Sequence, residues 1–95
     1  MVAKEINQLL KERTLPNATQ LSEAAESISS NIQEGFGRNV GPDRNRFLVY
    51  ARGSAEEAND RLKTRLDAKD IPAKTYWPLH HRLVIISRML TNLMT

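Results

Sequence analysis

The sequence predicts an all-α protein, an antiparallel up-down-up-down four-helix bundle with a short first helix. Apolar residues recur three and four positions apart almost throughout, which is the spacing of helices and not of strands. Proline or glycine interrupts this pattern near residues 15–16, 35–42 and 70–72, and the connections there are short. Because short connections favour antiparallel neighbours, we expect residues 1–95 to form a single four-helix-bundle domain.

The first predicted helix is short. Its apolar positions are Val2, Ile6, Leu9 and Leu10, and it ends before Pro16. At 1.5 Å per residue, such a helix of about 12 residues spans roughly 18 Å, whereas the third predicted helix spans roughly 39 Å. The first helix therefore leaves part of a groove uncovered, and a second copy of the chain is the simplest candidate to cover it.

The second predicted helix begins after a capping box formed by Asn17 and Gln20. Gly35 and Gly37 supply its stop. Its apolar stripe consists of Leu21, Ala24, Ala25, Ile28, Ile32 and Phe36.

The third predicted helix is the longest and runs from about Pro42 to about Ala68, with a proline and an acid in its first turn. Small residues in its apolar stripe allow another helix to approach closely. That stripe is Phe47, Ala51, Ser54, Ala55, Ala58, Leu62 and Leu66.

The fourth predicted helix follows Pro72, and Pro78 either begins the helix proper or kinks its first turns. Its apolar side carries Leu79, Leu83, Ile86, Leu90 and Leu93.

Composition narrows the class of protein. The chain has 95 residues, a net charge of +3 and no cysteine, which excludes disulfides and thiolate metal sites. The first residues lack the continuous apolar segment of a signal peptide, and no apolar stretch reaches membrane-spanning length. We therefore expect a cytoplasmic protein without membrane association.

The stretch SNIQEGFGR, residues 30–38, has three readings. A phosphate-binding loop needs glycines ahead of a helix, and an RNA-recognition strand needs aromatic residues in a sheet. Here the glycines follow a helix, so a helix stop is favoured, with Arg38 neutralising the negative helix end. Asn31 and Glu34 border the apolar stripe, and we expect them to join a polar network with Arg38, Arg52 or Ser54.

Two blocks in this chain resemble one family of bacterial four-helix bundles. Residues 27–38 read SISSNIQEGFGR and residues 46–57 read RFLVYARGSAEE. These blocks are similar to proteins encoded by intervening sequences in 23S ribosomal RNA genes and to accessory variability determinants of diversity-generating retroelements. The matching positions are Ser27, Ile28, Ser30, Asn31, Ile32, Glu34, Gly35, Gly37 and Arg38, then Phe47, Leu48, Ala51, Gly53, Ser54 and Glu57.

The resemblance implies a four-helix bundle that assembles into a ring of five. For the retroelement branch it also implies a basic surface that engages RNA and a reverse transcriptase. For most of the family no activity is firmly assigned.

Two functions remain open. The first is nucleic-acid binding by a homo-oligomer, through sequence-tolerant and salt-dependent phosphate contacts with RNA or DNA. The residues predicted to make these contacts are Arg38, Arg44, Arg46, Arg52, Arg61, Lys63 and Arg65. Ion pairs with nearby acids are the competing role of these residues, and Glu57 with Arg61 has the helical spacing for such a pair. The second function is a protein–protein assembly module, which uses apolar residues outside the main stripe of the fourth helix. These are Val84, Ile85, Met89 and Met94.

Catalysis is disfavoured, and neither a metal nor a cofactor is predicted. His80 and His81 are adjacent on a helix and point about 100° apart, so they cannot share a metal ion. His80 is expected near the core or an interface and His81 in solvent. Ser54 lacks the sequence context of a nucleophile, and Tyr76 and Trp77 are expected to be packing anchors.

Overall fold

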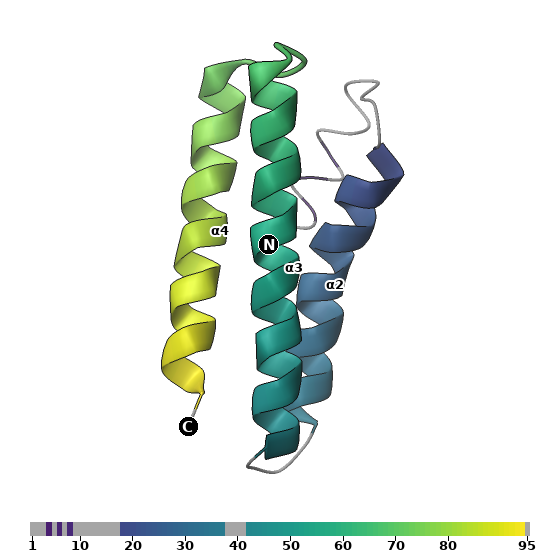
Figure 1. Ribbon diagram of the computed structural model, residues 1–95, viewed down its shortest axis with the longest axis vertical. Coiled ribbons are helices and arrows are strands. Elements are labelled where there is room, and N and C mark those ends of the chain that lie inside the picture. The colour runs from purple at the N-terminus through teal and green to yellow at the C-terminus, as the bar shows by residue number, and fades with distance from the viewer. Residues whose placement is uncertain (1–3, 5, 7, 9–17, 38–41, 95) are drawn as a thin grey trace.

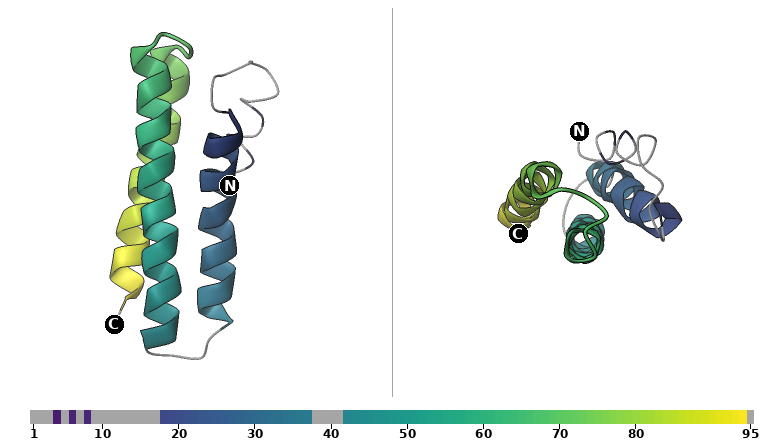
Figure 2. Two further views of the ribbon diagram at one scale, coloured as in Figure 1. Left: turned by 45° about the vertical axis from the view of Figure 1, so that its right-hand side comes forward. Right: turned by 90° about the horizontal axis from the view of Figure 1, so that it is seen from above.

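The computed structural model describes residues 4, 6, 8, 18–37 and 42–94, and the described part is all-α, as predicted. It contains three helices and no strand: α2 (Ala18–Phe36), α3 (Pro42–Asp67) and α4 (Ala73–Leu93). Successive helices run antiparallel, and α3 packs against both α2 and α4, whose backbones do not approach each other closely (Figure 1). The end-on view in Figure 2 shows α2 and α4 on either side of α3.

The N-terminal segment contributes to the core through Ile6. Lys4, Ile6 and Gln8 are helical, and Ile6 is 0% exposed whereas Lys4 and Gln8 face solvent. The bounds of the predicted first helix lie outside the described residues, and so does the predicted cap at Asn17. Ile6 lies in the same buried cluster as residues of α2, α3 and α4.

The core is built around small residues where α2 meets α3. Ala24 and Ala25 of α2 and Ala55 and Ala58 of α3 are all buried, so the two backbones approach closely. Larger apolar side chains surround this contact and link it to α4. They are Leu21, Ile28, Leu62, Ile71, Tyr76, Leu79 and Leu83. A second cluster of Leu48, Ala51 and Leu90 lies toward the other end of α3.

Phe36, Phe47 and Leu93 were assigned to the buried apolar stripes but are not buried in the structure. Phe36 is 53% exposed, because α2 ends at this residue and the chain leaves the bundle. Leu48 is buried in place of Phe47, which is half-buried and packs edge-to-face on Tyr50 with ring centroids 5.8 Å apart. Leu48 lies three residues before Ala51, so both face the core, whereas Phe47 is rotated away by about 100°. Leu93, in the last turn of α4, is largely exposed.

Gly35 lies near the end of α2 and also allows α3 to pack closely against it. It is buried, and a Cβ atom there would lie 3.3 Å from the Cβ of Phe47 and 3.4 Å from the carbonyl oxygen of Arg44. The absence of a side chain lets α3 begin close to the end of α2. Gly37 is exposed, and its amide donates to the carbonyl of Gln33 at 2.9 Å, as expected of a helix stop.

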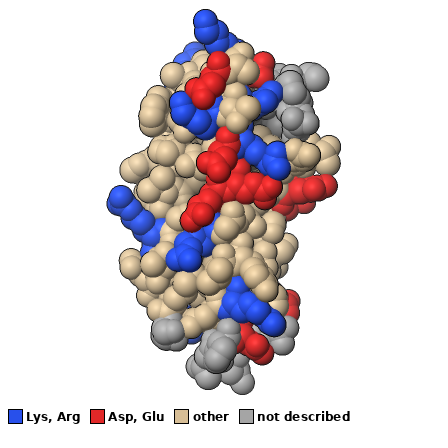
Figure 3. Space-filling model, viewed as in Figure 1, with Lys and Arg blue, Asp and Glu red and all other residues tan. Residues whose placement is uncertain are grey.

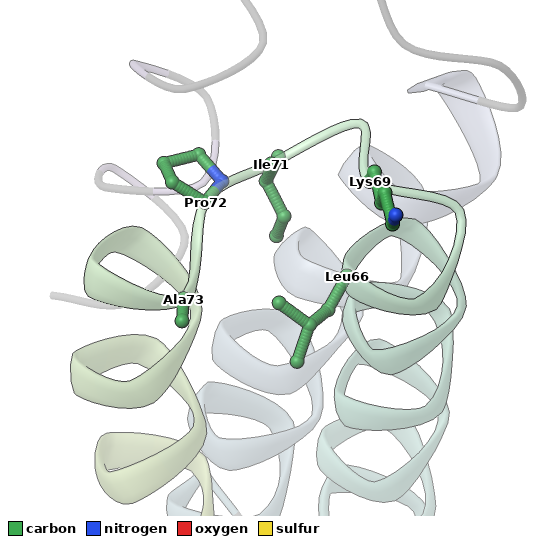
Figure 4. Close-up of a pocket in the computed structure, with 5 residues that line it drawn as sticks. All are labelled: Leu66, Lys69, Ile71, Pro72 and Ala73. Atoms are coloured by element: carbon green, nitrogen blue, oxygen red, sulfur yellow. The ribbon is translucent and has the colours of Figure 1, made fainter.

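The turn between α3 and α4 closes with a Schellman motif. Lys69 has a φ of 62°, and its amide donates to the Leu66 carbonyl. The amide of Asp70 donates to the Arg65 carbonyl, so both carbonyls of the last turn are satisfied. Apolar side chains of Leu66 and Ile71 line a shallow pocket under this turn (Figure 4). α4 then runs through Pro78, so this proline lies within the helix and does not begin it.

Candidate interaction surfaces

Arg44, which was predicted to contact phosphate, lies at the start of α3 and contacts the ends of α2 and α4. Its guanidinium lies over the ring of Phe36, 5.2 Å from the centroid, and Nη2 donates to the carbonyl of Leu93 at 3.4 Å. The end of α2, the start of α3 and the end of α4 therefore meet at this side chain. Arg44 has a structural role, which reduces its availability for a ligand.

Arg46 and Arg52 also have partners within the chain. Arg46 lies 3.7 Å from the carboxylate of Asp43 and over the ring of Phe47. Arg52 donates from Nη1 to Oγ1 of Thr91 at 3.1 Å, which links α3 to α4. Arg38 lies outside the described residues.

The remaining predicted cations form ion pairs near the C-terminal end of α3. The pairs are Arg61–Glu57, Lys63–Asp67 and Arg65–Asp70, each with a nearest N–O distance of 2.9 Å. Arg61 also donates to the side chain of Gln20 on α2. The hydrogen bond to Asp67 and the charge of that carboxylate raise the pKa of Lys63 above its usual value of 10.5. The Lys63–Asp67 pair is exposed, and such a pair contributes little to stability, whereas the Arg65–Asp70 pair is partly buried.

An acidic zone interrupts the predicted basic surface. Glu56, Glu57 and Asp60 are exposed on α3, between Arg52 and Arg61. Figure 3 shows a band of acidic side chains across the middle of one face of the molecule, with basic side chains above and below it. The cations of α3 therefore form two separate groups and not a continuous stripe.

Arg88 is a basic residue that the sequence analysis missed. It lines a groove of about 410 Å³ between α3 and α4 together with Arg52. The other lining residues are Glu56, Ser87, Thr91 and Asn92. The sequence carries a signal for this basic surface, because the segment that forms α4 contains basic residues and no Asp or Glu.

A polar network joins α2 to α3 and includes the predicted residues Asn31 and Ser54, which meet through the hydroxyl of Ser27. The Asn31 side-chain amide donates to Oγ of Ser27 at 2.9 Å and to the Ser27 carbonyl at 2.8 Å. Ser54 of α3 donates to the same Ser27 hydroxyl at 2.9 Å. Ser27 lies one turn before Asn31 on α2, so it is within closer reach than Arg52. Ser30 and Glu34 are exposed on the same helix.

A second polar contact involves the aromatic residues at the start of α4. Nδ1 of His80 lies 2.9 Å from Oδ1 of Asn59 and 3.2 Å from the hydroxyl of Tyr76. The Tyr76 ring is buried and stacks on the imidazole. Trp77 is 57% exposed, so the prediction that it anchors the packing is wrong, while the expected exposure of His81 is confirmed.

Exposed apolar residues gather on two helices. On α4, Trp77, Ile85 and Met89 are exposed, and Ile85 and Met89 share a face because they lie four residues apart, whereas Trp77 lies two turns earlier and about 80° around the helix from Ile85. On α3, Val49 and Tyr50 are 43% and 51% exposed. Of the predicted partner-binding residues, Ile85 and Met89 are exposed, whereas Val84 and Met94 are half-buried.

The described part is therefore an all-α protein whose candidate interaction surfaces are the groove between α3 and α4 and the exposed apolar residues of these two helices. Among the described residues, no group of three or more His, Asp and Glu is placed to hold a metal ion. None of the described helices is long and apolar enough to cross a membrane.

The chain belongs to the 23S rRNA-intervening sequence protein family, whose model matches residues 1–92. Comparison with curated proteins and with solved structures found no match. The intervening-sequence part of the resemblance is thereby confirmed, and the link to retroelement accessory proteins stays a prediction.

Proposed function

We propose that this protein is a non-catalytic assembly module, a four-helix bundle that associates with further copies of itself. The observation that carries the proposal is the face shared by the exposed residues Ile85 and Met89 on α4, with exposed Trp77 two turns before Ile85. Single exposed apolar residues are ordinary on protein surfaces, but their alignment along one helix is typical of an interface.

The four-helix arrangement is supported by Ile6. A completely buried side chain from the N-terminal segment lies in the same cluster as residues of α2, α3 and α4. The proposal therefore assigns this segment to a short first helix, which packs where α2 and α4 do not meet.

The positions of the arginines favour assembly over nucleic-acid binding. The described cations on the predicted phosphate-binding surface each contact a group of the same chain, and acids separate them into two groups. A phosphate backbone that follows α3 would pass over Glu56 and Asp60, and like charges repel.

Sedimentation velocity over a range of protein concentrations tests the assembly proposal. The monomer has a mass of 10.8 kDa, so an oligomer sediments well apart from it. We expect a species larger than the monomer whose proportion rises with concentration. A single species of monomer mass at the highest soluble concentration would contradict the proposal.

A second candidate function is nucleic-acid binding through the groove between α3 and α4. Two arginines, Arg52 and Arg88, line this groove together with the hydroxyl and amide groups of Ser87, Thr91 and Asn92. Such donors suit phosphate oxygens, and contacts of this kind are independent of base sequence.

The five-fold ring and the reverse transcriptase partner implied by the resemblance stay predictions.

Fluorescence anisotropy of labelled single-stranded RNA and duplex DNA tests this second function. Binding through phosphates weakens steeply as salt concentration rises. Replacing Arg52 and Arg88 by alanine should remove binding, whereas the same change at Lys69 and Lys74, near the turn before α4, should not. Equal loss in both double variants would show a nonspecific effect of net charge. No binding by the unmodified protein at low salt would exclude this function.

A further inference from the structure

Gly53 occupies a position where the subunit itself has no need of glycine. It is exposed in the middle of α3, where glycine destabilises a helix relative to alanine. A Cβ atom added there would meet nothing within 4 Å, whereas one at Gly35 would press against Phe47. Gly53 therefore leaves an open space on the surface of α3, which suits the close approach of a backbone or side chain from another molecule.

The residues around this space form a surface of mixed character. Val49 and Tyr50 lie one turn before Gly53 and are exposed and apolar. Glu56 and Asp60 lie one and two turns after it and are exposed acids. We call Val49, Tyr50, Gly53, Glu56 and Asp60 the outer face of α3.

α4 carries the complementary features. Its exposed residues Arg82, Ile85 and Met89 lie three and four positions apart and form what we call the outer face of α4. α4 contains no Asp or Glu that would repel the carboxylates of α3. Its apolar residues can pack on the apolar residues of the outer face of α3, and its basic residues can pair with the acids there.

The spacing of the two faces agrees in an antiparallel register. When Ile85 is placed over Gly53, Met89 falls opposite Val49, because both lie four residues away. Arg82 then falls opposite Glu56, three residues away in the other direction. Both helices rise 1.5 Å per residue, so these separations match along their axes.

We propose that the outer face of α4 in one copy packs on the outer face of α3 in a second copy, with Ile85 seated over Gly53. This inference rests on the proposed function and names the surfaces that carry it. The occupant is a second copy of this chain because charge, apolar character and spacing match between two faces of the same subunit. Opposite charges at such an interface fix the register and oppose incorrect pairing.

The variant Gly53→Leu tests the close approach. A Cβ atom there meets nothing within 4 Å, the position is exposed, and leucine favours the helix, so we expect an unchanged circular dichroism spectrum and no fall in the resistance to urea. We expect self-association to weaken at least tenfold in sedimentation experiments. The matched control is Ser30→Leu, which adds the same side chain to an exposed position of α2 and should leave association unchanged.

Charge exchange tests the register independently of Gly53. Arg82→Glu should weaken association by opposing Glu56, and the double variant Arg82→Glu with Glu56→Arg should restore it. An oligomeric Gly53→Leu protein with unchanged affinity would overturn this interface while leaving self-assembly in place. Unfolding of Gly53→Leu would overturn it as well, because glycine would then serve the subunit. A monomeric unmodified protein would instead contradict the proposed function.

Discussion

Replacement of Ile6 by alanine measures what the N-terminal segment contributes to the bundle. The change removes three carbon atoms from a completely buried side chain. At about 0.8 kcal/mol for each buried carbon group, the lost transfer free energy is roughly 2.4 kcal/mol. The cavity adds to this loss, and comparable substitutions cost about 2–5 kcal/mol in total. We expect the free energy of unfolding to fall by about 3 kcal/mol.

Urea unfolding followed by circular dichroism at a fixed protein concentration gives this quantity, because association makes stability depend on concentration. The control is Lys4→Ala, which changes an exposed residue of the same segment and should shift stability by less than about 0.5 kcal/mol. A similarly small effect for Ile6→Ala would refute the reasoning, since it would show that the segment does not pack in the core. A thermal scan should show a fall of roughly 4–8 °C for each kcal/mol lost.

Three further changes test contacts within the bundle, each by urea unfolding. Ser54→Ala removes the hydrogen bond to Ser27 and should cost about 0.5–1.5 kcal/mol; no loss would mean that water replaces the bond. Asn59→Ala removes the shorter of the two contacts of His80 Nδ1 and leaves the Tyr76 hydroxyl, so it should cost about 0.5–1.5 kcal/mol, and an unchanged midpoint would argue against the contact. Pro78→Ala restores a helix hydrogen bond within α4 and should stabilise the protein by up to about 3 kcal/mol; destabilisation would contradict this account.

The basic surface shows why charge runs in a sequence are ambiguous. Arg61 and Lys63 appear to extend a cationic surface when only basic residues are counted. In the structure each meets an acid four residues away, and Asp60 lies beside them. Helical spacing of opposite charges was visible in the sequence, and it favoured local pairing from the start.

The limits of α2 and α3 were predictable from the sequence, whereas the start of α4 was left open by Pro78. α3 begins at Pro42 and ends at Asp67, within one residue of the prediction, because proline and the turn at residues 68–72 mark its ends locally. The buried alanines of α2 and α3 were also predictable, since their periodicity reports which side of a helix faces the core.

Tertiary structure decided which apolar residues are covered and which polar groups meet. Phe36 and Trp77 have apolar side chains near the predicted stripes, yet both are exposed, because burial depends on whether another helix lies opposite. The pairing of Arg52 with Arg88 in one groove, and of Ser54 with Ser27, joins residues far apart in the chain. Periodicity specifies the face of a single helix, whereas the contacts across helices arise only when those faces are brought together in a particular register.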